Sequence, residues 1–156
     1  MLDVHDKETR SRNMKAIRNR DTKPELIVRK LLHRNGFRFR VSCGKLPGKP
    51  DIWMAKWNAV IFINGCFWHM HECEKFRLPD SRQEFWQTKL NSNQMRDRIK
   101  IEELKNRGIR VLTIWECALT GKGKLNDTIL LTLFKTWLFS GRTESEIDSG
   151  GLIIRQ

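Results

Sequence analysis

The sequence contains no tyrosine, only four prolines and no hydrophobic run long enough to cross a membrane. Its longest strong apolar run, Ala59 to Ile63, has the length of a β-strand, whereas a membrane span needs roughly 18 residues. The first residues, MLDVHD, lack the apolar core of a secretory signal. Low-complexity tracts and internal repeats are also absent. These absences argue against membrane and secreted classes and predict a cytoplasmic protein.

Acidic side chains are scarce relative to basic ones. The 156 residues contain 30 Lys and Arg against 18 Asp and Glu, which gives a net charge of +12 and a pI near 10.0. Residues 1–49 hold 14 basic and 5 acidic side chains (net +9), and residues 50–156 hold 16 and 13 (net +3). A basic domain with its charge collected in one region predicts a nucleic-acid partner. An anionic membrane is the weaker alternative, because no basic stretch carries a broad apolar face.

The hydrophobic pattern predicts one α/β domain over residues 1–156, since a chain of this length fits a single domain. A cap at Asp21 or Thr22, with Pro24 in the first turn, predicts a helix that ends at Gly36. Ser81 and Glu84 form a candidate capping box for a long helix to about residue 107. Further helices are predicted at 10–19 and 125–139, strands at 37–41, 51–55, 58–63 and 109–115, and a loose tail at 140–156. This order predicts a mixed sheet flanked by helices.

Cysteine and histidine gather in one short segment. Cys66, His69, His71 and Cys73 lie within eight residues, and Cys117 follows the best predicted strand. Clustered Cys and His in a reducing compartment indicate metal ligands before disulfides. We favour Cys66, His71, Cys73 and Cys117 as four ligands of a structural zinc ion. The alternative is that they are ordinary buried thiols beside a surface histidine.

Two acidic residues are candidates for a second metal site. Asp51 begins a predicted strand directly after a flexible segment, and its carboxylate suits Mg²⁺, which prefers oxygen ligands. Phosphodiester hydrolysis commonly uses such an ion. Taken alone, an Asp at the start of a strand is more often a cap or a surface charge, and Glu25 by itself is an acid at the start of a helix.

One face of the predicted long helix carries Trp86, Lys89, Asn93 and Asp97, at steps of 3, 4 and 4 residues. A tryptophan beside Lys and Asn suits a surface that contacts DNA, because Trp can wedge between bases while the polar groups reach base edges. Phe67 and Trp68 add two aromatic rings in the preceding loop. The alternative is that these rings pack around the zinc site.

The segment GCFWHMHEC at 65–73, with Pro50-Asp51 before it and WEC at 115–117 after it, closely resembles the very-short-patch-repair mismatch endonucleases. The resemblance begins with DVHD at 3–6 and RNM at 12–14 and extends to about residue 140. It implies a restriction-endonuclease-like fold. It also implies an endonuclease that nicks DNA on the 5′ side of the T in a T·G mismatch, the product of 5-methylcytosine deamination.

The resemblance also implies roles for individual residues. In the active site, Asp51 and the main-chain carbonyl of Ile63 bind Mg²⁺, His69 is the general base, Glu25 acts through metal-bound water, and Asp97 orients His69. The zinc ligands are the four favoured above. The DNA-binding residues are Met14, Phe67, Trp68, Trp86, Lys89 and Asn93. Asn64 departs from the family, which can carry a histidine there as an accessory active-site residue, and asparagine cannot transfer a proton near neutral pH.

The expected partner is therefore double-stranded DNA with a T·G mismatch, together with other mismatch-repair proteins. Because one nick on one strand requires a single active site, we expect a monomer. Two alternatives stay open: a non-catalytic DNA-binding module stapled by zinc, and a nuclease of the same fold with a different specificity.

Overall fold

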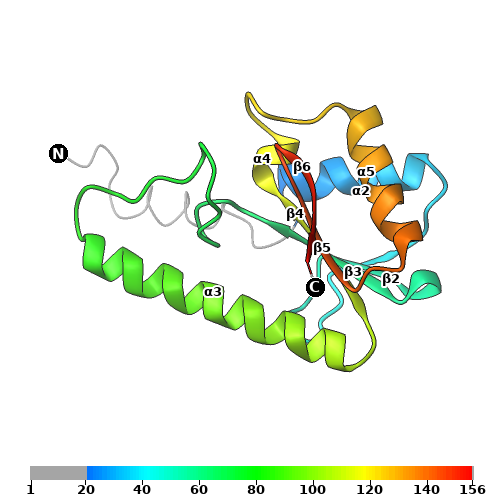
Figure 1. The fold of residues 1–156 in the computed structure, drawn as a ribbon, viewed down its shortest axis with the longest axis horizontal. Helices are drawn as coiled ribbons and strands as arrows, with labels where there is room; N and C mark the ends of the chain where they lie inside the picture. Colours follow the sequence, from blue (N-terminus) through cyan, green and yellow to red (C-terminus); the bar gives the residue numbers. More distant parts are fainter. Residues whose placement is uncertain (1–20, 156) are drawn as a thin grey trace, which may run out of the picture.

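A computed structural model describes residues 21–155, and Figure 1 shows its fold. The elements follow in the order α2 (Lys23–Arg34), β1 (Arg40–Val41), β2 (Ile52–Met54), the 3₁₀ turn η1 (Ala55–Trp57), β3 (Ala59–Asn64), α3 (Gln83–Asn106), β4 (Arg110–Trp115), α4 (Glu116–Leu119), α5 (Asp127–Ser140), β5 (Glu144–Asp148) and β6 (Gly151–Arg155). The first 20 residues, a basic segment that we expect to contact DNA, and the helix predicted at 10–19 lie outside the described residues. None of the helices within 21–155 is long and apolar enough to cross a membrane.

Within 21–155 the strands form one mixed sheet in the order β1-β2-β3-β4-β5-β6. The first three strands pair antiparallel, β3, β4 and β5 run parallel, and β6 returns antiparallel along the edge. The predicted mixed sheet flanked by helices is therefore confirmed at this level. The β3–β4 register places Asn64 opposite Trp115, at the end of the sheet where the loop to α3 begins.

The two faces of the sheet are covered by different helices (Figure 1). One face packs against α2, α4 and α5 through a large apolar cluster, and the other packs against α3 through a small one. The position of a residue along its strand decides to which of the two clusters its side chain belongs, because successive residues point to opposite faces of the sheet. Thus Ile61 and Leu112 belong to the large cluster, whereas Val60 and Val111 belong to the small one.

The expected loose tail at 140–156 is wrong. Gly141 closes α5 with a φ of +76°, and the chain then forms β5 and β6, which complete the sheet. Ile147 of β5 is fully buried in the large apolar cluster. The sequence ESEID of β5 does not look like a buried strand, because three of its five residues are acidic. In the structure these three side chains point to the α3 side of the sheet and bond to polar and cationic partners instead of water.

The observed starts of α3 and β1 also differ from the predicted ones, whereas that of α2 agrees. The cap of α2 is Thr22, as predicted, with its Oγ1 accepting from the Glu25 amide at 3.5 Å. The predicted capping box of α3 is wrong, because the cap is Arg82, in a left-handed conformation with no side-chain hydrogen bond to the helix. Of the strand predicted at 37–41, only β1 forms, although Phe37 and Phe39 still pack against the large cluster.

Candidate active site and metal centre

The carboxylate of Asp51 lies where β2 begins and β3 ends. Antiparallel pairing of these strands brings the two ends together, and Asp51 Oδ2 accepts the Ile63 amide at 2.7 Å. A cavity of about 220 Å³ opens there, lined by the five residues expected to form the active site, Glu25, Asp51, Asn64, His69 and Asp97, and by Ile63, Gly48, Lys49, Phe62, Lys100 and Ile101. The structure therefore brings together residues from four separate parts of the sequence.

The electrostatics of this cavity favour a bound cation. Burial and, to a smaller extent, the neighbouring Glu25 carboxylate raise the pKa of Asp51 from 3.8 to about 6, against the opposing effects of the Ile63 amide, Arg29 and His69. A carboxylate whose ionised form is disfavoured in this way gains the most from a nearby positive ion.

Glu25 is buried on the first turn of α2. Its Oε2 accepts two hydrogen bonds, from the Asp21 amide at 2.8 Å and from Arg29 Nη2 at 2.9 Å. Arg29 also reaches Asp21 Oδ1 at 2.6 Å. These contacts hold the Glu25 carboxylate in place beside the cavity. Arg29 was not identified from the sequence; its place one turn after Glu25 was the available signal, since residues four apart share a helix face.

His69 and Asp97 form a hydrogen-bonded pair across the cavity. Nδ1 of His69, in the loop after β3, bonds to Oδ2 of Asp97 on α3. With Nδ1 engaged in this way, Nε2 is the ring nitrogen available for proton transfer. The arrangement of a histidine oriented by a carboxylate suits a general base.

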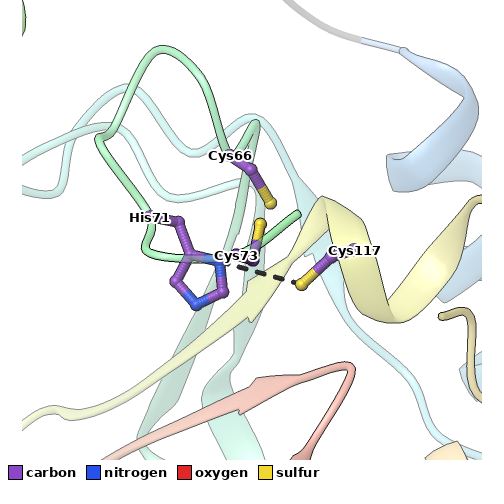
Figure 2. A group of neighbouring side chains, drawn as sticks. All are labelled: Cys66, His71, Cys73 and Cys117. Atoms are coloured by element: carbon purple, nitrogen blue, oxygen red, sulfur yellow. Dashed lines mark hydrogen bonds between the residues drawn. The ribbon is translucent and has the colours of Figure 1, made fainter. Parts of the chain in front are cut away.

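Cys66, His71, Cys73 and Cys117 converge on one point, and their ligand atoms all lie within 4.8 Å of one another (Figure 2). The first three belong to the loop after β3, and Cys117 belongs to α4, directly after β4. His71 Nδ1 lies 3.7 Å from Cys117 Sγ. The ligands of a tetrahedral zinc ion, with bonds of roughly 2.0–2.3 Å, are separated by about 3.5–3.8 Å. The one pair at 3.7 Å matches this spacing, and three thiols and one imidazole gathered within 4.8 Å could hold a structural zinc ion.

The chemistry of the cluster agrees with its geometry. Cys66 and Cys117 are buried, and burial raises the pKa of the Cys66 thiol. Buried thiolates need a cation, and a metal ion would supply the positive charge. All four cysteines are free, so no disulfide competes for these sulfurs. The fourth cysteine, Cys43, is not part of the cluster.

The predicted aromatic residues, Phe67, Trp68 and Trp86, form a continuous group of rings. Phe67 contacts Trp68 and Trp86 at centroid distances of 5.1 and 5.6 Å, and Phe76 and Phe85, which the sequence analysis did not single out, extend the group. Trp68 is nevertheless 48% exposed. The rings therefore pack on one another and still present a surface to solvent.

Lys89 and Asn93 join this aromatic group from α3. Lys89 Nζ lies 5.5 Å from the Trp68 ring centroid and 5.7 Å from that of Trp86, and Asn93 Nδ2 donates to the Trp68 carbonyl at 3.2 Å. The predicted common helix face therefore contacts the loop that carries His69. Met14, the remaining predicted DNA contact, lies outside the described residues.

Comparison with known proteins identifies the class as DNA endonucleases. Residues 2–75 match the family model described as DNA mismatch endonuclease Vsr. The chain is 45% identical over 152 residues to the DNA mismatch endonuclease Vsr of Escherichia coli (strain K12), which covers 97% of both chains. It is also 42% identical over 122 residues to the type II nicking enzyme V.NmeAIP of Neisseria meningitidis serogroup A, covering 78% of this chain and 87% of that one. The chain therefore belongs to the Vsr DNA mismatch endonuclease family.

Proposed function

We propose that this protein nicks one DNA strand on the 5′ side of the T in a T·G mismatch, by Mg²⁺-assisted hydrolysis, and so initiates very short patch repair. The observation that carries the proposal is the convergence of Asp51, Glu25 and the His69–Asp97 pair on one cavity. The name of the Escherichia coli relative, a mismatch endonuclease, supports the substrate class.

In this mechanism the side chains divide the work of hydrolysis. Asp51 and the Ile63 carbonyl would hold Mg²⁺, with Glu25 contacting its hydration shell. When bound, the ion supplies positive charge to the phosphate and the leaving oxygen. Nε2 of His69 takes a proton from the attacking water, and Asp97 keeps the ring oriented through Nδ1. Asn64 can hydrogen-bond to the phosphate but contributes no proton transfer.

Recognition of the mismatch is assigned to the exposed aromatic group. Phe67, Trp68 and Trp86 would enter the major groove beside the mispair, while Met14 approaches from the minor groove. Unstacking costs a few kcal/mol per base step, and a mispair unstacks more easily than a matched pair. Lys89 and Asn93 would then read the mispaired bases.

The remaining predicted features support this function. The basic segment 1–20 would contact phosphates. The logarithm of the DNA-binding constant should then fall linearly with the logarithm of the salt concentration, with a slope of roughly −0.9 per neutralised phosphate. A structural zinc ion in the Cys₃His cluster would hold the loop that carries His69, Phe67 and Trp68. A single copy suffices for a single nick, so the proposed enzyme acts as a monomer, alongside other mismatch-repair proteins.

The test is strand-specific nicking of an end-labelled duplex that contains one T·G mismatch in a methylated-cytosine context. We expect one Mg²⁺-dependent cut 5′ of the mismatched T, none in the matched duplex and none in the presence of a chelator. Asp51→Asn should abolish the cut, whereas Asp80→Asn, the same change at an exposed acid, should not. Mg²⁺ should also raise the Tm of the wild type but not that of Asp51→Asn.

Other outcomes identify the alternatives. Binding without a cut at any divalent ion would indicate a non-catalytic DNA-binding module and direct attention to Asn64. Cleavage of matched or differently mispaired DNA would indicate a nuclease of other specificity, and the type II nicking enzymes among the relatives make the flanking sequence the first variable to change.

A further inference from the structure

The imidazole of His71 is held on three sides by other side chains. Nδ1 faces Cys117 Sγ and the cysteine cluster, and one ring face stacks on Trp115, with centroids 4.2 Å apart and planes inclined by 12°. The opposite nitrogen, Nε2, lies 3.3 Å from Asp148 Oδ2. Because Nδ1 points to the cluster, Nε2 carries the ring proton in the neutral ligand form and donates it to Asp148.

Asp148 is the last residue of β5, and the turn that follows it makes a second contact with the cluster. The amide of Ser149 lies 3.4 Å from Cys117 Sγ, positioned to donate a hydrogen bond to that sulfur. Asp148 Oδ1 also accepts the Gly150 amide at 2.8 Å, which fixes the carboxylate within the turn. One turn thus reaches two of the four candidate metal ligands.

A second acid of β5, Glu146, contacts the His71 ring indirectly, through Trp115. Glu146 Oε1 accepts from Trp115 Nε1 at 2.7 Å, and Trp115 is the residue on which His71 stacks. The two acids face the same side of β5, because residues two apart share a face of a strand. Both therefore lie on the α3 side of the sheet, where the loop after β3 returns to it.

We propose that the β5–β6 hairpin is an outer shell of the metal centre, in which Asp148 is a positioning residue that orients His71 and the Ser149 amide stabilises the Cys117 thiolate. This inference rests on the metal centre of the proposed function and extends it to a segment that supplies no metal ligand. A carboxylate that accepts from a ligating histidine fixes its tautomer and orientation, and losing such a partner typically lowers metal affinity about 10- to 100-fold.

The sharpest variant is Asp148→Asn. Asparagine replaces one of the two carboxylate oxygens by an NH₂ group, which donates and cannot accept. Because Oδ2 accepts from His71 Nε2 and Oδ1 accepts from the Gly150 amide, an asparagine in the same side-chain position loses one of these two bonds. The backbone and side-chain volume hardly change. Asp127→Asn is the matched control, since Asp127 is an exposed acid of α5 that pairs only with Arg34 among the interactions described.

The experiment begins with the zinc content of the purified wild type, for which we expect one equivalent. Zinc transfer to a chromophoric chelator is then compared under native conditions. We expect Asp148→Asn to hold zinc about 10- to 100-fold more weakly and Asp127→Asn to match the wild type. A wild type without zinc would overturn the metal centre itself. A zinc-loaded wild type matched by Asp148→Asn would overturn only the present inference.

Replacing zinc by Co²⁺ separates positioning from general stability, because the visible absorption of Co²⁺ reports the geometry of its ligands. If Asp148 orients His71, Asp148→Asn shifts these absorption bands. If the bands are unchanged and only Tm falls, Asp148 merely stabilises the turn, and the inference is wrong.

A backbone test covers the case in which Asp148→Asn fails to fold. Ser149→Pro removes the amide donor to Cys117, whereas Ser149→Ala keeps it and loses only the hydroxyl. We expect Ser149→Pro to release zinc several-fold faster than Ser149→Ala. Equal release from these two variants would contradict the role of the Ser149 amide.

Discussion

The two faces of the sheet are built from the same strands but differ sharply in what fills them. The face under α2, α4 and α5 is closed by aliphatic and aromatic side chains, among them the fully buried Phe134 and Trp137. The face under α3 has an apolar cluster only at one end, around Val60, Val111 and Leu104. Its other end carries acids and a cavity of about 730 Å³ that shares His69 and Asp97 with the candidate active site.

This difference indicates a division of labour within one small domain. Apolar burial on the closed face supplies most of the stabilisation, at about 25 cal/mol per Å². The α3 face is therefore free to hold carboxylates, imidazoles and cations that burial would otherwise disfavour. Substitutions on the two faces should separate stability from activity.

The largest expected effect is on the chemistry of the α3 face. His69→Ala should lower nicking by about 10²- to 10⁴-fold, the usual contribution of a general base, and leave mismatch binding intact. The measurement is single-turnover nicking beside a binding assay. His33→Ala, the same change at an exposed position of α2, is the control. Nicking at the wild-type rate by His69→Ala would refute the general-base assignment.

The converse change on the closed face should cost stability alone. Phe134→Ala removes a fully buried ring and should lower the free energy of unfolding by about 3–5 kcal/mol, measured by urea denaturation. Phe139→Ala, on the same helix but 62% exposed, should cost far less. Below its Tm, the Phe134 variant should nick at a near-normal rate. A large loss of activity in the folded variant would show that the faces are not separable.

A buried charge should make the α3 face sensitive to pH. Burial alone raises the pKa of Glu144, but hydrogen bonds from Arg98 at 2.7 and 2.9 Å and from Lys105 at 3.1 Å outweigh it and hold that pKa below its usual value. A carboxyl with a lowered folded-state pKa stabilises the fold above its unfolded pKa, about 4.3, and this stabilisation is lost as pH falls through the folded-state value.

We therefore expect Glu144→Gln to lower stability at pH 7 by about 1–3 kcal/mol, since Arg98 is half exposed and water screens part of the effect. The difference from the wild type should shrink as pH is lowered below 4. Urea unfolding at several pH values measures it. Glu102→Gln removes an exposed partner of the same arginine and should change little. A difference that does not vary with pH would contradict the ion-pair explanation.

The smallest expected effect concerns the helix starts. Asn126 caps α5 on the closed face, and its Oδ1 accepts the Ile129 amide at 2.8 Å. Asn126→Ala should cost about 1 kcal/mol, measured by urea denaturation. Arg82→Ala at the start of α3 removes no capping bond and should cost less. Equal losses would mean that the cap contributes nothing beyond its side-chain packing.

Sequence patterns predicted the closed face and the metal cluster well, and for physical reasons. Capping signals located α2, and apolar segments of strand length located β2, β3 and β4, because those segments bury apolar residues. Spacing alone favoured the four residues that the structure brings together around Cys66. The active-site roles of Asp51 and His69 came instead from the family resemblance, since a single acid or histidine carries little local signal.

The sequence predictions failed where polar residues are buried or hold other residues in place. β5 was missed because its three acids, Glu144, Glu146 and Asp148, are typical of a solvent-exposed tail. Their partners lie on α3, on β4 and in the loop after β3, and local sequence does not reveal them. The role of Arg29 was missed because its contacts with Asp21 and Glu25 depend on how α2 is oriented over the cavity. In both cases the information resides in tertiary contacts that local periodicity cannot encode.

The position of β5 in the sheet has a consequence for the synthesis of the protein. β5 lies between β4 and β6, and its Ile147 fills the closed face, yet it is translated after the four preceding strands and the helices that cover them. Domains fold as units once their contacts are available, and contacts distant in sequence form late. The sheet is therefore completed only after residue 155 has left the ribosome. A translation product that stops before residue 144 would lack this strand and the Ile147 side chain that fills the closed face.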